Sequence, residues 1–414
     1  MKKVLLSAYA CSPLRGSEEN IGWSWATNIA RQGYEVWCLT NVQDREATLE
    51  AHSKMGLPNL HFVFVDLPFG MDKHFLNPSS KKIYLHYLVW RNKASSVAKK
   101  LHAKLQFDIA HHVTYGSLQQ GTYLWKLKGV QFIFGPVSGG QKALPEFKEY
   151  FEGSWKTEVI RNMISNFSIR YSTNLKNSVS RAKWILAANN ETKEMVEEIE
   201  QAACGRIPGN VDVVLDNAVP APMLNIEYKE RVPGNKLKLL WVGRMLPRKG
   251  LKLIFHALSY LPKETPYELT IVGGGSQFPL VEGWIREYNL DPAHINIIGQ
   301  VPFAQVIQYY QQSDVFIFCS LRDACGAQLN EAMAFGLPVI TFDTNGASLA
   351  VPDNCGIKIQ PTTKEETARA MAKAVLKFCS DIPYRQACSH QAYNHARLNT
   401  WERKISTVAA KFYN

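Results

Sequence analysis

Two cations stand at the end of an apolar segment in the C-terminal half of the chain. The segment WVGRMLPRKG (241–250) reads as a strand that ends at Gly243, followed by Arg244, a turn and Lys249. An arginine can grip a phosphate with two parallel hydrogen bonds, and a lysine adds a compact positive charge. Two cations separated by a turn could therefore hold a diphosphate from two sides. A surface turn with solvated charges explains the same residues equally well.

Two carboxylates and a glycine occur together further along, in residues 320–343. Asp323 is expected in a loop after an apolar strand, and Glu331 within a helix that opens near Gly326. A glycine at a helix start leaves backbone N–H groups free to face an anion, which the helix dipole also favours. Glu331 could accept two hydrogen bonds from a ribose diol. A carboxylate on a helix is more often a cap or part of a solvated face, but its neighbours here are apolar.

A run of three glycines, which includes Gly273 and Gly274, follows the strand-like residues 270–272. Glycines let a backbone approach a ligand closely. Glycine turns after strands are common, however, so the run alone is weak support for a ligand site.

Alternating strands and helices are expected to position these residues. Apolar runs at 2–10 and 34–40 enclose a helical pattern at 21–33, and similar runs recur before residue 220. This alternation is typical of a parallel sheet covered on both faces.

A second alternation begins after residues 219–235, which read as a linker because they hold three prolines, a glycine and several charges. We therefore predict the α/β class, with two doubly wound Rossmann-like domains over 1–220 and 221–394. Such sheets bind ligands beyond the carboxyl ends of their strands, so the expected site is a cleft between the domains.

Together, GRMLPRKG (243–250), the glycine run and the pair from Asp323 to Glu331 resemble the signature of glycosyltransferase family 4. Residues 214–220 (VLDNAVP) are similar to that family's Pro-Asn-Gly-Val turn. The resemblance implies a retaining, nucleotide-sugar-dependent glycosyltransferase with the GT-B fold, in which two Rossmann-like domains face a cleft. It also implies that a final helix, within 395–414, packs back on the first domain.

The resemblance assigns a role to each matching residue. Arg244 and Lys249 would neutralise the donor diphosphate, and Glu331 would hold the ribose. Asp323 stands where the family usually has a longer Glu, and Cys325 where it usually has Phe. The catalytic set would be His112, Arg244, Lys249 and Asp323. The further donor-binding residues would be Gly16, Ser17, Gly243, Gly273, Gly274, Gln300, Val301, Cys325, Gly326, Ala327, Gln328, Leu329 and Glu331.

The first domain is expected to contribute the acceptor side. His111 and His112 end one apolar run, and the family places a histidine in this loop near the donor sugar. Adjacent residues on a strand point to opposite faces, so only one histidine can face the ligand; we favour His112 and leave His111 as an acceptor contact. The glycine-rich strand end at Gly139 and Gly140 would shape the acceptor pocket.

Composition and charge indicate which other binding partners to expect. The 414 residues include 47 Lys and Arg against 36 Asp and Glu, a net charge of +11. This charge fits a phosphate-bearing ligand or an anionic surface, but the chain has no recognised nucleic-acid-reading motif. No Asp-x-Asp triplet and no zinc-like Cys/His spacing occur, so we expect no metal and no cofactor.

Residues 73–107 contain eight Lys or Arg and no acid, together with Tyr84, Tyr87, Leu88 and Trp90. They predict either peripheral contact with anionic lipid or a basic solvated helix face over an apolar stripe. No apolar stretch approaches the roughly 18 residues of a membrane span, so we expect a cytoplasmic protein, with peripheral membrane contact as the alternative.

The expected function is transfer of a hexose from a nucleotide sugar, with UDP as the favoured nucleotide, to a saccharide or lipid-linked saccharide in polysaccharide or glycolipid biosynthesis. Two alternatives remain open from the sequence. One is a nucleotide-sugar epimerase of the same fold, and the other is a catalytically silent saccharide-binding subunit.

Overall fold

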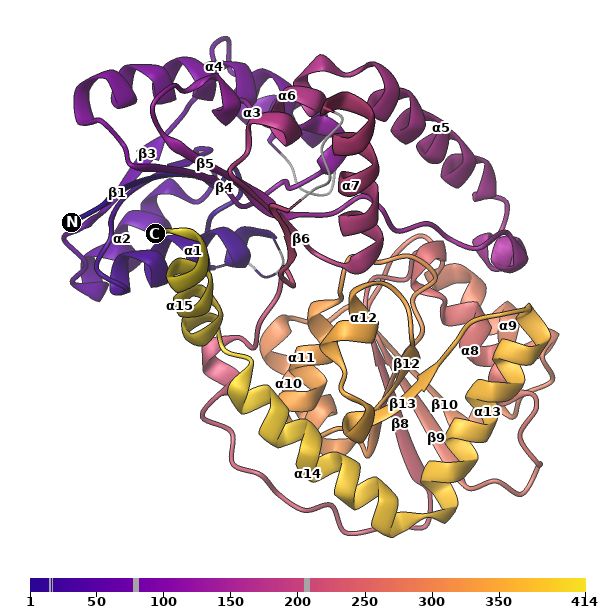
Figure 1. Ribbon diagram of the computed structural model, residues 1–414. Helices are drawn as coiled ribbons and strands as arrows, with labels where there is room; N and C mark the ends of the chain where they lie inside the picture. The colour runs from indigo at the N-terminus through magenta and orange to yellow at the C-terminus, as the bar shows by residue number, and fades with distance from the viewer. Residues whose placement is uncertain (15, 17, 77–81, 205–208) are drawn as a thin grey trace. The chain divides into compact units, whose positions relative to one another are not determined.

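The computed structural model describes residues 1–14, 16, 18–76, 82–204 and 209–414 (Figure 1). The chain forms two compact units. Unit 1 contains residues 1–140, 164–216 and 401–414, and unit 2 contains residues 141–163 and 217–400. Each unit is built around its own parallel sheet, which confirms the predicted α/β class.

Unit 1 has a seven-stranded parallel sheet in the order β3-β2-β1-β4-β5-β6-β7. Its central strand is fully buried from Val4 to Ser7 because it lies between β2 and β4. The strands are β1 Lys3–Ser7, β2 Glu35–Thr40, β3 Leu60–Phe64, β4 Ile109–His112, β5 Gln131–Val137, β6 Trp184–Ala187 and β7 Val211–Val213.

The helices of unit 1 connect these strands. Trp25 and Ile29 in α1 are fully buried, as the predicted helical spacing requires. The α-helices are α1 Glu18–Arg31, α2 Arg45–Met55, α3 Met71–Phe75, α4 Lys82–Leu105, α6 Thr173–Arg181, α7 Asn190–Cys204 and α15 Trp401–Phe412. Short 3-10 turns are η1 Leu118–Gln120 and η2 Leu124–Lys126.

Unit 2 has a six-stranded parallel sheet in the order β10-β9-β8-β11-β12-β13. Its strands are β8 Leu237–Val242, β9 Tyr267–Val272, β10 Ile295–Gly299, β11 Val315–Phe318, β12 Val339–Phe342 and β13 Gly356–Ile359. The chain leaves β8 towards β9 and β10, whereas β11 leads towards β12 and β13. The strand order therefore reverses between β8 and β11, the position at which such sheets bind ligands beyond the strand ends.

Helices cover both faces of this sheet, with α8, α9 and α13 on one side and α10 and α11 on the other (Figure 1). The α-helices are α8 Leu251–Leu258, α9 Val281–Glu287, α10 Phe303–Gln312, α11 Ala327–Ala334, α12 Asn345–Ala350, α13 Lys364–Ser380 and α14 Ile382–Leu398. The 3-10 turns are η3 Pro145–Phe151, η4 Ala221–Met223, η5 Pro247–Lys249, η6 Phe278–Leu280, η7 Pro292–His294 and η8 Asp353–Cys355.

The compact units differ from the predicted domains at residues 141–163. Phe147, Tyr150 and Phe151 of η3 are buried in the hydrophobic core of unit 2. The Tyr150 hydroxyl also hydrogen-bonds Nδ1 of His256 on α8, at 2.7 Å. These aromatic side chains attach the segment to unit 2, although it lies between two segments of unit 1 in the sequence. Helix α5 (Trp155–Tyr171) then carries the chain from one unit to the next.

The C-terminal segment divides at the start of the last helix. Helix α14 belongs to unit 2, whereas α15 belongs to unit 1 and packs against α1. The transfer therefore begins at Trp401, and residues 395–400 stay with unit 2. Trp401, Ile405 and Phe412 are buried, so an apolar face holds α15 in place.

Candidate functional site

The turn after β8 places Lys249 beside the end of β11. Gly250 has φ 71°, and a Cβ there would collide with the carbonyl oxygen of Cys319, so the turn requires a glycine. The Lys249 ammonium donates a hydrogen bond to the Asp323 carboxylate and lies 5.0 Å from the centre of the Phe318 ring. The structure therefore joins two of the predicted site residues, which are 74 positions apart, in one ion pair.

Both members of this pair are largely withdrawn from water. Burial lowers the pKa of Lys249, while the Asp323 charge opposes that shift. Burial acts to raise the pKa of Asp323, but Lys249 and Arg248 outweigh it and the pKa falls below its ordinary value. The Arg248 guanidinium lies 3.5 Å from the same carboxylate, and the Ala324 N–H donates to it at 3.1 Å. Asp323 is therefore held ionised and in a fixed orientation.

Arg244 is placed differently from Lys249. Its side chain is exposed, and no partner for its guanidinium is found among the residues that the structure describes. The residue directly follows Gly243 at the end of β8. An exposed guanidinium at the strand end is available to an anion without first breaking an ion pair.

Three glycine-containing loops meet next to Arg244. The Gly243 N–H donates to Val272, and the Gly273 N–H donates to Gly299, at 3.0 and 2.8 Å. Gly274 lies close to the Gln300 side chain, and its carbonyl accepts a hydrogen bond from the Met245 N–H. The carboxyl edge of the sheet therefore brings together Gly243, Gly273, Gly274 and Gln300. Val301, the next residue along the chain, is half-buried.

Gly326 shapes the start of α11. Its φ is 101°, and an added Cβ would lie 2.8 Å from the Phe318 ring, so only glycine fits without a shift of that ring. One predicted donor contact must be corrected here. The Leu329 N–H already donates to the Gly326 carbonyl at 3.1 Å, because this bond closes the first turn of the helix. The N–H groups of Gly326, Ala327 and Gln328 precede it and remain the candidates for an anion.

Glu331 is a buried carboxylate with a partner that the sequence did not reveal. The Tyr310 hydroxyl of α10 donates to Oε2 of Glu331 at 2.8 Å. Burial raises the pKa of Glu331 to about 7, and the Tyr310 hydrogen bond opposes that rise. The Tyr310 ring stacks on Phe335 with the ring planes 10° apart. Glu331 is therefore oriented through one oxygen, and it changes charge near neutral pH.

Arg231, from the predicted linker, supports both helices behind Glu331. Its guanidinium donates to the carbonyl of Tyr310 at 3.2 Å and to that of Ser313, near the end of α10. It also donates to the carbonyls of Phe335 and Gly336, just after α11, at 2.9 and 3.1 Å. Helix ends leave carbonyls without intrahelical partners, so one arginine stabilises two helix ends at once.

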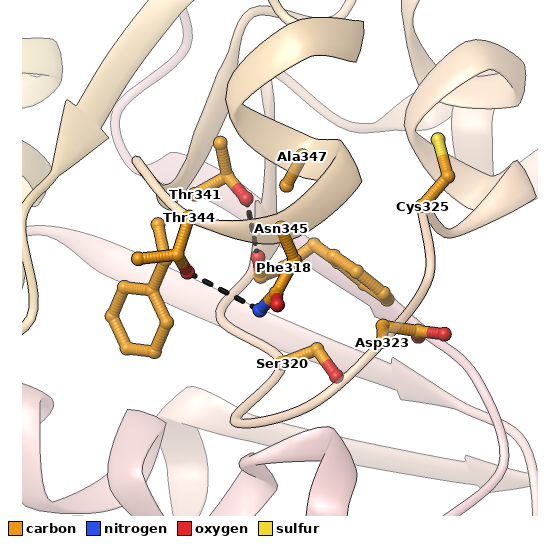
Figure 2. A pocket seen from close by; sticks show the side chains of 9 residues that line it. Phe318, Ser320, Asp323, Cys325, Thr341, Thr344, Asn345 and Ala347 are labelled. Carbon is orange, nitrogen blue, oxygen red and sulfur yellow. Dashed lines mark hydrogen bonds between the residues drawn. The ribbon is translucent and has the colours of Figure 1, made fainter. Parts of the chain in front are cut away.

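A small pocket opens beside Asp323 and Cys325 (Figure 2). Its other wall comes from the residues after β12, including Thr344 and Asn345, and Asn345 has φ 55°. Sequence reasoning missed these two residues. They follow an apolar strand in the same way as Asp323 does, so the strand-end rule could have found them.

His111 does not serve as an acceptor contact in this structure, which corrects the prediction. The ring is fully buried; Nδ1 lies 2.6 Å from the Tyr413 hydroxyl, and Nε2 lies 2.6 Å from the Gly135 carbonyl oxygen. Both nitrogens are therefore used within unit 1, where His111 ties β4 to β5 and to the C-terminal segment.

His112 keeps one ring nitrogen without a close partner. Nδ1 lies 3.2 Å from the Thr122 hydroxyl, while no described residue hydrogen-bonds Nε2 with normal geometry. Burial lowers the pKa of His112 to about 4, although the nearby Tyr115 backbone acts in the opposite direction. His112 is thus neutral at pH 7, at the carboxyl end of β4 next to the strand-order reversal of unit 1.

The other predicted residues of unit 1 differ in their surroundings. Gly16 is exposed, and a Cβ there would meet nothing within 4 Å, whereas Ser17 lies outside the described residues. A Cβ on Gly139 would collide with the Gln119 side chain. A Cβ on Gly140 would collide with the start of α7, so packing alone accounts for both glycines.

Glu18 is a residue of unit 1 that sequence reasoning missed. It begins α1, and its Oε2 accepts a hydrogen bond from the Tyr115 N–H at 3.2 Å. Burial raises the pKa of Glu18 to about 7. A half-buried acid beside the loop after β4 was not predictable, because the contact joins residues 97 positions apart.

Known proteins resemble unit 2 most clearly. Residues 224–395 match the family model described as glycosyl transferases group 1. The matched residues lie within unit 2. This match confirms the resemblance that the strand-end motifs indicated.

Curated relatives match part of the chain. A phosphatidylinositol N-acetylglucosaminyltransferase subunit of Saccharomyces cerevisiae is 22% identical over 169 residues, which are 38% of this chain and 37% of that protein. A GDP-mannose-dependent alpha-(1-6)-phosphatidylinositol monomannoside mannosyltransferase of Mycolicibacterium smegmatis is 28% identical over 49% of this chain and 53% of that protein. The chain therefore spans between about a third and a half of these relatives.

Solved structures match the whole chain in fold. A sucrose-phosphate synthase from Thermosynechococcus elongatus has a TM-score of 0.67 and 17% identity, covering 100% of this chain and 98% of that one. An Anabaena protein solved in complex with UDP has a TM-score of 0.60 and 13% identity, covering 99% and 100%. These similarities confirm the predicted GT-B fold.

Proposed function

We propose that the protein transfers a sugar from a nucleotide sugar to a saccharide or lipid-linked saccharide acceptor. The observation that carries this proposal is the arrangement at the carboxyl edge of the unit 2 sheet. There, the paired Lys249 and Asp323 flank the strand-order reversal, and Gly326 opens the helix that holds Glu331. The group 1 glycosyl transferase match covers these residues.

The leaving group in such a transfer is a nucleoside diphosphate, whose negative charge grows as the sugar bond breaks. Groups that are already oriented towards this charge lower the barrier more than groups that must move. Lys249 is held in place by Asp323 and Phe318. Arg244, which precedes it in the same turn, is exposed. We assign the diphosphate to Lys249, Arg244 and the N–H groups at the start of α11.

Glu331 is the proposed ribose contact, because a buried carboxylate with one oxygen held by Tyr310 retains a second oxygen for a hydroxyl donor. Asp323 is the proposed contact for the sugar. Because Lys249 bridges to it, sugar binding and diphosphate binding are coupled through one ion pair. We further propose UDP as the carried nucleotide and retention of the anomeric configuration.

Direct measurement of the products tests this proposal. The protein is incubated with a panel of UDP- and GDP-linked sugars, and nucleotide release and the anomeric configuration of the product are followed by NMR. We expect UDP release with retention. Conversion of the sugar with no nucleotide released would instead show an epimerase, and no turnover or nucleotide binding with any donor would favour a silent subunit.

We also propose that the transfer needs no metal ion, because the local positive charge comes from side chains and the sequence lacks an Asp-x-Asp triplet. Among the described residues, no group of three or more His, Cys, Asp or Glu is arranged to hold a metal. Turnover should therefore be unchanged in the presence of EDTA. A loss that Mg²⁺ or Mn²⁺ restores would contradict this assignment.

The predicted lipid contact through residues 73–107 needs a partial correction. Tyr87 and Trp90 are fully buried in the core of unit 1, because α4 packs this side against the sheet. Tyr84, Leu85 and Leu88 are exposed on α4, and Lys99 and Lys100 are also exposed. Contact with a membrane through this helix stays a prediction, as does a cytoplasmic location. None of the described helices has the length and apolarity that crossing a membrane demands.

A further inference from the structure

Helix α5, labelled in Figure 1, exposes most of its large apolar side chains. Six of its seventeen residues are large apolar side chains with between 42% and 65% of their surface exposed: Val159, Ile160, Met163, Ile164, Phe167 and Tyr171. Residues spaced by three and four positions share one face of a helix, so the helical geometry of α5 places these side chains along one face. We call these six residues the α5 stripe.

The side of α5 that faces the protein makes both apolar and polar contacts. Trp155 packs against the core of unit 2, and Ile169 packs against the core of unit 1. Glu158 is buried and accepts two hydrogen bonds from Arg322, at 2.7 and 2.9 Å. Ser165 is also buried, and its hydroxyl accepts a hydrogen bond from the Gln119 side chain at 2.8 Å. These apolar and polar contacts attach the helix to the protein, whereas the side chains of the α5 stripe remain exposed.

The exposed charge next to the α5 stripe is positive. Lys156 and Arg170 are exposed, and the Arg170 guanidinium lies over the Tyr171 ring at 5.5 Å. The single acid in α5 is the buried Glu158. An apolar helix face with aromatic side chains and flanking cations is the composition of helices that lie in the interface of an anionic bilayer.

We propose that the α5 stripe docks on the surface of a lipid bilayer that contains anionic lipid. The apolar side chains enter the boundary between headgroups and acyl chains, while Lys156 and Arg170 contact anionic headgroups. A second copy of the chain fits this face less well. A stable dimer buries about 800 Å² on each partner from some 20–30 residues, and pairing two stripes would bring like charges together.

Sedimentation of the full chain with large vesicles tests the proposal. The unmodified protein should bind vesicles of phosphatidylcholine mixed with phosphatidylglycerol, and high salt should weaken this binding. Ile164→Ser and Phe167→Ser should each weaken binding about tenfold, because each removes one apolar side chain from the bilayer. Leu398→Ser is the matched control, since Leu398 on α14 is 57% exposed and Ile164 is 60% exposed.

The charge requirement has its own pair of variants. Arg170→Glu should weaken binding to the anionic vesicles about tenfold. Lys263→Glu, at an exposed position outside α5, should change it much less. All of these positions are exposed, so the unfolding midpoint of each variant should equal that of the unmodified protein.

Several results would overturn the proposal. One is equal binding by Ile164→Ser and Leu398→Ser, and another is equal binding to vesicles with and without phosphatidylglycerol. A loss of binding caused only by Leu85→Ser would assign the contact to α4 instead. A dimer in analytical ultracentrifugation that Phe167→Ser converts to monomer would assign the α5 stripe to a second copy.

Discussion

At the scale of single residues, Lys249 is the group whose removal should affect chemistry most. Its ammonium sits between a carboxylate and an aromatic ring, so its position is set before any ligand arrives. In Lys249→Ala, the diphosphate loses one oriented cation, and we expect turnover to fall about 100-fold, as for loss of one preorganised charge-stabilising donor. Steady-state kinetics with the preferred donor would measure this effect.

Lys252→Ala is the matched control for that variant. Lys252 is also largely buried and ion-paired, but its partners are Glu152 at 2.5 Å and Glu287 at 3.0 Å, which are not among the predicted site residues. Its loss should leave turnover within about twofold of the unmodified protein. Equal losses in both variants would show that Lys249 acts through general stability.

The Tyr310 hydroxyl should set the pH range of nucleotide binding. Glu331 has a pKa of about 7, so it is mostly protonated below that pH and mostly ionised above it. An ionised carboxylate accepts hydrogen bonds from a ribose more strongly, so UDP affinity should rise between about pH 6 and pH 8. Tyr310→Phe removes a hydrogen bond that lowers this pKa, so the rise should move to higher pH.

Calorimetric titrations with UDP across this pH range test the prediction. The phenylalanine ring keeps the stacking on Phe335, so a change in the midpoint reports on the hydroxyl. UDP carrying 2′-deoxyribose provides the control, because it offers Glu331 one hydroxyl fewer. An identical midpoint in Tyr310→Phe and in the unmodified protein would contradict the assigned role of Tyr310.

The sequence predicted residue types better than residue partners. Lys249, Asp323 and Glu331 were selected because cations and acids at strand and helix ends suit a diphosphate and a ribose. The direct pairing of Lys249 with Asp323, and of Tyr310 with Glu331, depends on how neighbouring elements pack. Spacing along one chain carries no such information. For His111, the residue type suggested a ligand contact, but its partner gives it a structural role. Only the fold places the Tyr413 hydroxyl against its ring.

At the scale of elements, Gly326 determines whether α11 can begin where it does. In Gly326→Ala, the new methyl group would meet the Phe318 ring, and the backbone would keep a φ of 101° that alanine rarely adopts. We expect the free energy of unfolding to fall by about 1–3 kcal/mol and UDP affinity to fall with it. Denaturant unfolding and calorimetry measure the two effects.

Gly283→Ala is the control within the same unit. Gly283 lies in α9, and an added Cβ there meets nothing within 4 Å. Alanine is a better helix former than glycine, so this variant should gain about 0.5–1 kcal/mol of stability and leave UDP affinity unchanged. If Gly326→Ala behaved like Gly283→Ala, the proposed steric requirement at α11 would be wrong.

Most strands could be predicted because buried parallel strands are short apolar runs bounded by loops. The attachment of residues 141–163 to unit 2 could not, because the aromatic residues of η3 look the same whichever core they enter. The outward apolar face of α5 was also missed. A helical apolar period indicates a buried face, and only the structure shows which face contacts the protein.

At the scale of the whole molecule, the two sheets place their strand-order reversals at β1/β4 and at β8/β11. The residues proposed to bind the donor diphosphate and ribose belong to unit 2. In unit 1, His112 ends β4 and Glu18 begins α1. The net charge of +11 favours anionic ligands but selects none of them. We therefore expect recognition of a nucleoside diphosphate to depend on the local arrangement in unit 2.

Calorimetric titration of UDP into the unmodified protein and into Lys249→Ala, Arg244→Ala and Lys252→Ala tests this central claim most directly. We predict that the unmodified protein and Lys252→Ala bind with equal affinity. Lys249→Ala and Arg244→Ala should each bind at least tenfold more weakly, the equivalent of about 1.4 kcal/mol. Equal affinity in all four proteins, or no binding of UDP, GDP or ADP at millimolar concentration, would contradict the claim that the unit 2 strand ends capture a nucleoside diphosphate.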